Sequence, residues 1–169
     1  GLDPAAVPTS RIAREVATLF QNPDRQICKD TVLDEVAFGL ELTGIDRAEA
    51  LRRAQLVIDR FGLPADEAPF SLSRGQRQMV ALASVVVVEP KIVVLDEPTS
   101  GLDRANMERV AAALRRVAAA GVAVALVTHD YEFLCAVCDE VAEVKGGRVS
   151  ARYDLDPAHT TRVRMRFGF

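Results

Sequence analysis

The sequence has no apolar stretch long enough to cross a lipid bilayer. Its longest largely apolar run, Met79 to Val88, is well short of a membrane-spanning helix. It also lacks a basic cluster, since its 18 arginines and three lysines are scattered and the net charge is −3. A chain with this charge distribution offers no electrostatic footprint for a nucleic acid. We therefore expect neither a membrane span nor a nucleic-acid partner.

Cysteine is scarce, and its number is odd. Three cysteines do not make a disulfide framework and are typical of a reducing cytoplasm. Cys135 and Cys138 lie three residues apart, on one face of an expected helix, and without a second pair this favours core packing over a redox or metal site. The start of the chain, "GLDPAAVPTS", lacks an initiator Met and the features of a signal peptide, so we expect a processed or cropped piece.

What the chain does have is enough apolar sequence for one domain, with 49% hydrophobic residues over 169 positions. Short apolar segments predict strands over 16–20, 92–95 and 122–127, and the β-branched second one favours a strand covered on both faces. Helical patterns fill much of the remainder, at about 31–43, 46–61, 74–88, 107–118 and 131–136, before a hairpin over 141–150. The two successive helices between 31 and 61 predict a helical lobe inserted into an α/β core with a parallel sheet.

Polar side chains follow all three expected strands. They are Gln21, Asp96 with Glu97, and His129. In a parallel sheet these ends meet at one edge, where ligands bind. Carboxylates and a Gln amide there can hold Mg²⁺ and orient a water, and a His can donate to a phosphate, which is a constellation for phosphoryl transfer. A polar residue after a strand more often only caps a turn, and for Gln21 or His129 taken singly that alternative stays open.

The segment "SLSRGQRQ", residues 71 to 78, allows two interpretations. Ser73 and Gln76 have the spacing of a capping box, which marks an ordinary helix start. The same free N–H groups, with the helix dipole, form an anion site that a phosphate can approach closely at Gly75. This stretch does not decide between the two.

Together these strings resemble the ATP-binding-cassette (ABC) ATPases. Gln21 is similar to the family's Q-loop, 72–76 to its signature motif, 92–97 to its Walker B strand, 100–103 to its D-loop, and His129 to its switch histidine. "LFQNPDRQI" and "TVLDEVAFGLE" resemble energy-coupling-factor and cobalt- or nickel-type importers. The resemblance implies a P-loop-NTPase-like fold with a mostly parallel sheet, in a partial nucleotide-binding domain over 1–169. It places a helical subdomain at about 31–88 and a C-terminal tail at about 152–169, where His159 and three arginines suggest a loose terminus.

The resemblance also implies a role for each site residue. Asp96 would hold Mg²⁺ with Gln21, Glu97 would be the catalytic base, Gln21 would sense the metal and the water, and His129 would contact the γ-phosphate. Ser73, Arg74, Gly75 and Gln76 would grip ATP bound by a second nucleotide-binding domain, with Asp103 at the same interface. Arg74 stands where the family usually has Gly, and we expect function to be retained.

The function implied is an ATP-hydrolysing subunit of an importer for a small solute, a vitamin or a metal ion. Such a subunit works peripherally on the cytoplasmic face of the membrane, paired with an identical or different nucleotide-binding domain. A transmembrane subunit would contact the segment after Gln21.

One family element is missing. The phosphate-binding Walker A loop, G-x-x-x-x-G-K-[ST], needs a lysine, but Lys29, Lys91 and Lys145 each lack its neighbours. We expect the N-terminal strand to be absent with this loop, and this chain alone to be inactive. A truncated, non-catalytic remnant or partner-binding module is therefore an alternative. A DNA-maintenance ATPase of the same type is a weaker one, because the chain between Gln21 and Ser73 carries only two ordinary helices in place of a long coiled coil.

Overall fold

The computed structural model describes residues 8, 12 and 15–155, which fall in two compact units divided after His129. The first unit contains a parallel sheet made of β1 (Val16–Leu19), β2 (Ile92–Asp96) and β3 (Ala123–Val127), in that spatial order. The predicted α/β class with a parallel sheet is confirmed. The strands lie almost where the apolar segments placed them.

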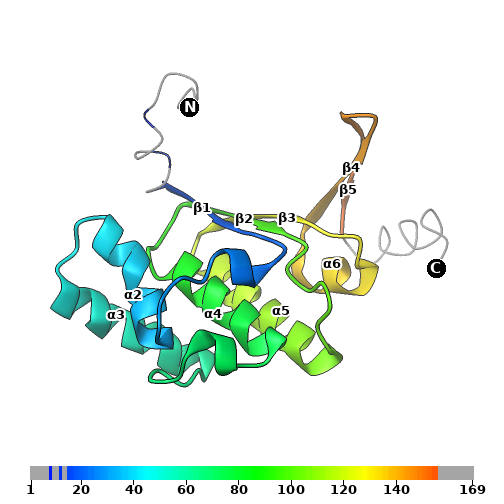
Figure 1. Ribbon diagram of the computed structural model, residues 1–169. Helices are drawn as coiled ribbons and strands as arrows, with labels where there is room; N and C mark the ends of the chain where they lie inside the picture. Colours follow the sequence, from blue (N-terminus) through cyan, green and yellow to red (C-terminus); the bar gives the residue numbers. More distant parts are fainter. Residues whose placement is uncertain (1–7, 9–11, 13–14, 156–169) are drawn as a thin grey trace. The chain divides into compact units, whose positions relative to one another are not determined.

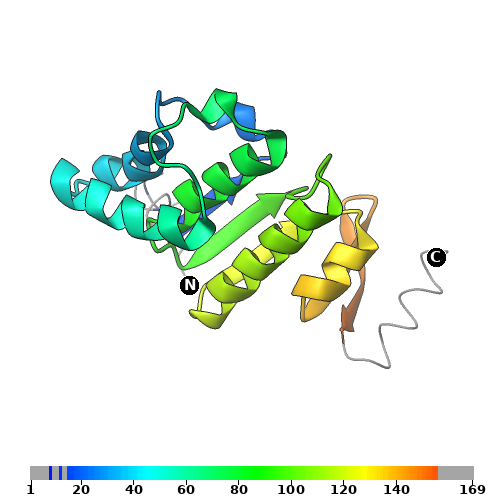
Figure 2. The ribbon, with the colours of Figure 1, turned by 90° about the horizontal axis from the view of Figure 1, so that it is seen from below.

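Four helices of the first unit lie together on one side of this sheet (Figures 1 and 2). They are α2 (Val32–Leu42), α3 (Arg47–Phe61), α4 (Arg74–Val86) and α5 (Arg104–Ala119). Two short 3-10 turns, η1 (Pro23–Arg25) and η2 (Pro69–Ser71), complete the unit. The helices begin where capping residues predict: Thr31, Asp46, Ser73 and Asp103 each accept a hydrogen bond from the first turn. The first three helices fall within the expected helical subdomain, whose boundaries stay a prediction.

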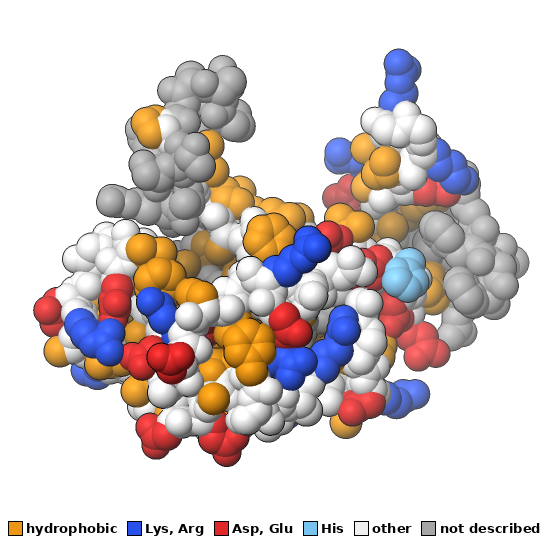
Figure 3. All heavy atoms as spheres, viewed as in Figure 1, with side chains coloured by type: hydrophobic (Ala, Val, Ile, Leu, Met, Phe, Trp, Pro, Cys, Tyr) orange, Lys and Arg blue, Asp and Glu red, His pale blue; other side chains and the backbone are white. Residues whose placement is uncertain are grey.

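The core lies between the sheet and these helices. Leu19, Val93 and Leu95 from the strands are fully buried with Val80 and Leu114 from α4 and α5. The other face of the sheet is open in the part of the chain described: Ile92 is 40% exposed and Val127 63%. Figure 3 shows hydrophobic side chains along this side. The expectation that residues 92–95 form a strand covered on both faces is therefore wrong for the described structure.

The second unit consists of α6 (Tyr131–Val137) and an antiparallel hairpin of β4 (Glu140–Lys145) and β5 (Arg148–Asp154). Gly146 and Gly147 make the predicted turn, and both have positive φ angles, 57° and 74°, as a tight two-residue hairpin loop requires. The expected tail from about 152 begins inside β5, and its remainder, with His159 and the arginines, lies outside the described residues, as does the start of the chain. Every helix that the structure describes is too short or too polar to span a bilayer.

Candidate functional site at the carboxyl ends of three parallel strands

The strand register brings the predicted polar residues to one edge of the sheet. Leu19 of β1 pairs with Leu95 of β2, which pairs with Leu126 of β3. Gln21, Glu97 and Thr128 each lie two residues beyond this row, and His129 follows directly. The three strand ends therefore converge as the sequence predicted.

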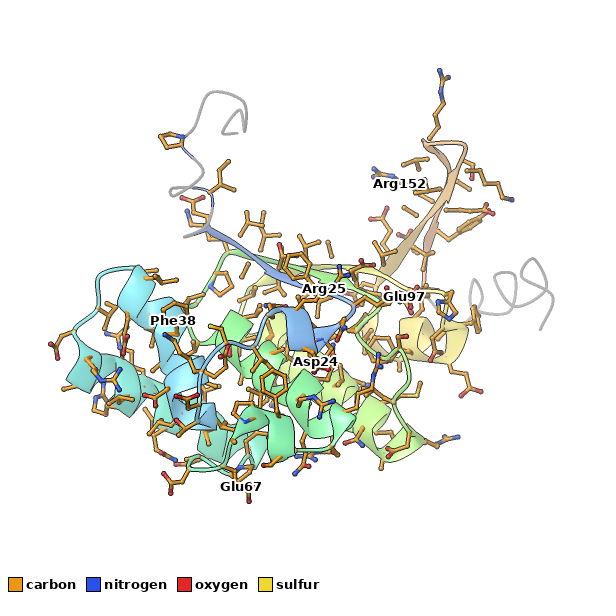
Figure 4. The ribbon with its side chains drawn as sticks, viewed as in Figure 1. Asp24, Arg25, Phe38, Glu67, Glu97 and Arg152 are labelled. Atoms are coloured by element: carbon orange, nitrogen blue, oxygen red, sulfur yellow. The ribbon has the colours of Figure 1, made fainter. Side chains whose placement is uncertain are left out.

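Glu97 is at the centre of this edge, at the end of β2 (Figure 4). Its carboxylate oxygen Oε1 lies 2.7 Å from Nδ1 of His129, and Oε2 accepts a hydrogen bond from the Thr128 hydroxyl at 3.4 Å. A carboxylate can only accept, so we assign the shared hydrogen to Nδ1 of His129. The Glu97 side chain is 15% exposed, whereas His129 is 82% exposed. The pair thus joins a shielded carboxylate to an imidazole facing solvent.

The backbone at Glu97 is unusual. Its φ angle is +46°, in the left-handed region that non-glycine residues rarely adopt. Two hydrogen bonds hold it there: the Glu97 N–H donates to the Val127 carbonyl at 2.8 Å, and the Ser100 N–H donates to the Glu97 carbonyl at 3.1 Å. The first ties the residue to the end of β3, and the second closes the turn after β2. This conformation is what turns the carboxylate toward His129.

The same edge provides oxygen ligands suited to Mg²⁺. Asp96 and Gln21 are both exposed there and offer a carboxylate and an amide oxygen. Among the described residues no group of three or more His, Cys, Asp or Glu side chains could hold a metal ion by itself. A site with few protein ligands still fits Mg²⁺, which keeps several waters and completes its shell with substrate phosphates.

The signature segment forms the start of α4. The Ser73 hydroxyl accepts from the Gln76 N–H at 3.3 Å, and the Gln76 side chain accepts from the Ser73 N–H at 3.0 Å, so the predicted capping box is present. This geometry suits an ordinary helix start and an anion site equally, and it tests neither role.

Asn106 is a site residue that sequence reasoning missed. Asp103, the cap of α5, accepts from the Asn106 N–H at 2.8 Å through Oδ1 and from the Asn106 amide group at 3.0 Å through Oδ2. The same side chain lies against Gly75, where an added Cβ would come within 2.4 Å of the Asn106 Cγ. Asn106 therefore links the D-loop aspartate to the signature motif. The spacing of Asp103 and Asn106 signalled a cap, but nothing local indicated the contact with Gly75.

Arg74 makes a second link between these segments. Its guanidinium carbon would lie 3.3 Å from a Cβ placed on Gly101, which has a φ angle of +71°. The arginine that departs from the usual glycine thus lies over the D-loop of its own chain. The predicted residues form two groups, one at the strand ends and one around the start of α4.

Comparison with known proteins identifies the family. A family model described as "ABC transporter" matches residues 3–100, more than half of the chain. The chain belongs to the ABC transporter family. The predicted resemblance is confirmed.

Several ABC proteins are similar over most of the chain. An energy-coupling factor transporter ATP-binding protein, EcfA1, of Lacticaseibacillus paracasei is 43% identical over 124 residues, which are 72% of this chain and 45% of that protein. The structure of cbiO1 from Clostridium perfringens, described as part of the ABC transporter complex cbiONQ, matches with a TM-score of 0.79 and 29% identity, covering 92% of this chain and 65% of that one.

The ATP-binding cassette MJ0796, described as bacterial and solved as a dimer bound to ADP and Pi, matches with a TM-score of 0.76 and 26% identity, over 92% of this chain and 68% of that one. The chain spans between 24% and 60% of the length of the first curated relatives.

Proposed function

We propose that this chain is the larger part of a nucleotide-binding subunit that hydrolyses ATP to drive an ABC importer. The observation that carries the proposal is the hydrogen bond between Glu97 and His129 at an edge that also presents Gln21 and Asp96. A shielded carboxylate held by an imidazole is a suitable general base for water. The similarity to an energy-coupling-factor protein and to cbiO1 supports the importer.

In this mechanism Glu97 accepts a proton from water as the water oxygen bonds to the γ-phosphorus. The bond between that phosphorus and the bridging oxygen breaks, which releases ADP and phosphate. His129 holds the Glu97 carboxylate in position through Nδ1 and contacts the γ-phosphate. Gln21 orients the water. In-line displacement needs little else from the protein beyond positioning and charge stabilisation.

Mg²⁺, held by Asp96 and Gln21, would neutralise developing charge on the phosphates when bound. Asp96 is placed for this role because it is exposed at the end of β2, directly before the base.

The signature segment would act on a second nucleotide-binding domain. Ser73, Arg74, Gly75 and Gln76 would contact ATP held by the partner, with Asp103 at the same interface. The partner is an identical or paralogous subunit, and the dimeric state of MJ0796 supports the pairing. A membrane subunit would contact the region after Gln21 on the cytoplasmic face, as the complex containing cbiO1 suggests, and it would choose the small solute, a vitamin or a metal ion.

Replacement of the proposed base tests this function. In the complete subunit, Glu97→Gln should lower the ATP turnover number by about a hundredfold or more, because Gln keeps the shape but cannot accept the proton. Magnesium-dependent phosphate release at saturating ATP measures it.

The matched control is Glu108→Gln on α5, an exposed carboxylate paired only with its helix neighbour Arg104 at 3.2 Å among the contacts described. This change should leave turnover unaltered. Undiminished turnover in Glu97→Gln would remove Glu97 from its role, and a complete subunit without any turnover would favour a non-catalytic binding module.

A further inference from the structure

An ion pair joins two segments that are 53 residues apart. Nε of Arg77, in the first turns of α4, lies 2.7 Å from Oδ1 of Asp24 in η1. The Arg77 side chain is 19% exposed and that of Asp24 40%, so the pair is better shielded than most surface ion pairs. Figure 4 shows Asp24 at η1, beside α4. The pair therefore joins the turn after Gln21 to the signature helix.

On the α4 side, Arg77 reaches back past the helix start. Its Nη1 donates to the carbonyl of Leu72, the residue immediately before the cap Ser73. One guanidinium thus holds Asp24 and the peptide that leads into the signature motif. The planar fork of arginine allows this, because its donors point in fixed, separate directions.

On the other side, η1 is tied to the end of β1. The Gln26 side chain donates to the Thr18 carbonyl at 3.1 Å and accepts from the Phe20 N–H at 3.0 Å. Asn22 caps η1 by accepting from the Asp24 N–H at 3.1 Å. Gln21 lies between these two anchors. A displacement of the backbone at Gln21 therefore displaces η1, and Asp24 with it.

We propose that Arg77 and Asp24 are positioning residues that couple the backbone around Gln21 to the signature motif. A change at Gln21 on metal or water binding passes through η1 and the Asp24–Arg77 pair to the peptide before Ser73. This inference rests on the proposed function for its meaning in catalysis. The mechanical link itself does not.

Hydrogen exchange on the 169-residue chain tests the link without nucleotide. Asp24→Asn should raise the exchange rates of the Gln76 and Arg77 amides about fivefold, although these amides are some fifty residues away. Both amides donate to Ser73, to its hydroxyl and its carbonyl, so they report on the cap that Leu72 leads into. A coupling of this size is typical of one shielded charge pair.

Two further variants separate coupling from loss of stability. Arg77→Lys keeps the charge but cannot serve Asp24 and the Leu72 carbonyl in the same fork, so we expect an intermediate increase. Asp34→Asn is the matched control: Asp34 also lies in the first turn of a helix and pairs with an arginine, Arg47, at 2.8 Å. It should leave the Gln76 and Arg77 amides unchanged. Exchange changes confined to residues 22–27 in Asp24→Asn would overturn the proposal.

The consequence for catalysis is tested in the complete subunit. In a Glu97→Gln background, Asp24→Asn should weaken ATP-driven dimerisation about fivefold, measured by sedimentation, while ATP binding by the single subunit stays the same. Equal dimerisation would overturn the functional half of the proposal. A parent subunit that binds ATP but never dimerises would count against the proposed function, and the exchange result would still decide the link.

Discussion

At the residue scale, Glu97 combines an unfavourable backbone with a precise side-chain contact. A left-handed conformation costs a residue with a Cβ about 1–2 kcal/mol, and the hydrogen bonds to Val127 and Ser100 hold it in place. Because this strain belongs to the backbone, Gln is a sharper test than Gly at this position. Gly would remove the carboxylate and the strain together, and the two effects could not be separated.

The cysteines give a prediction at the same scale. Burial, the charge of Asp139 and the neighbouring Cys135 raise the pKa of the Cys138 thiol to about 11. Its thiolate fraction at pH 8 is therefore about a hundredfold below that of an ordinary thiol, and the thiolate is the reactive form. Alkylation of Cys138 by iodoacetamide at pH 8 should be slower by a similar factor and should speed up as the pH rises toward 11.

Mass spectrometry of the labelled peptide measures this rate, and the urea-unfolded chain, where burial is lost, is the control. Equal rates in the folded and unfolded chains would contradict the prediction. The raised pKa agrees with the interpretation of Cys135 and Cys138 as packing residues in preference to a redox pair.

At the element scale, the sequence predicted the parts that depend on local chemistry. The caps at Thr31, Asp46 and Ser73 and the terminating Gly62 are all present, because a cap is decided within three or four residues. The convergence of the strand ends followed from the parallel sheet. The Glu97–His129 contact did not, because side chains from separate strands leave no local pattern.

The same limit applies to the contacts between elements. The Asp24–Arg77 pair and the packing of Asn106 on Gly75 each join distant segments, so neither spacing nor periodicity indicates them. The burial of β2 was overestimated for a related reason: an apolar run shows that a strand can be covered on both faces, but the covering elements must be present as well.

Gly75 and Asn106 give a prediction for the start of α4. Gly75→Ala should destabilise the chain by about 1–3 kcal/mol, because the new methyl group would overlap the Asn106 side chain, which Asp103 holds in place. Urea unfolding of the purified chain measures the change.

Asn106→Ala removes the obstacle, so Gly75→Ala should be nearly neutral or stabilising in that background, where the helix propensity of alanine remains. Additive effects in the double variant would show that the packing of Asn106 does not explain the glycine.

At the scale of the whole molecule, the absence of a G-x-x-x-x-G-K-[ST] loop from these 169 residues leads to a further prediction. The purified chain should hydrolyse no ATP above background, because no phosphate cradle of backbone N–H groups and lysine holds the nucleotide; removal of even one electrostatic donor lowers rates about a hundredfold or more in other enzymes. Phosphate release with and without Mg²⁺ measures it. Robust magnesium-dependent turnover by this chain would refute the prediction.

The side chain of Gln26 has a consequence for how the sheet can extend. Its amide donates to Thr18 and accepts from Phe20, which are the two bonds that one residue of an adjacent parallel strand would make. The outer margin of β1 is thereby sealed by a substitute for a fourth strand, and edge-to-edge association with other chains is blocked there. Any additional strand must therefore join beside β3, so the sheet can lengthen in one direction only.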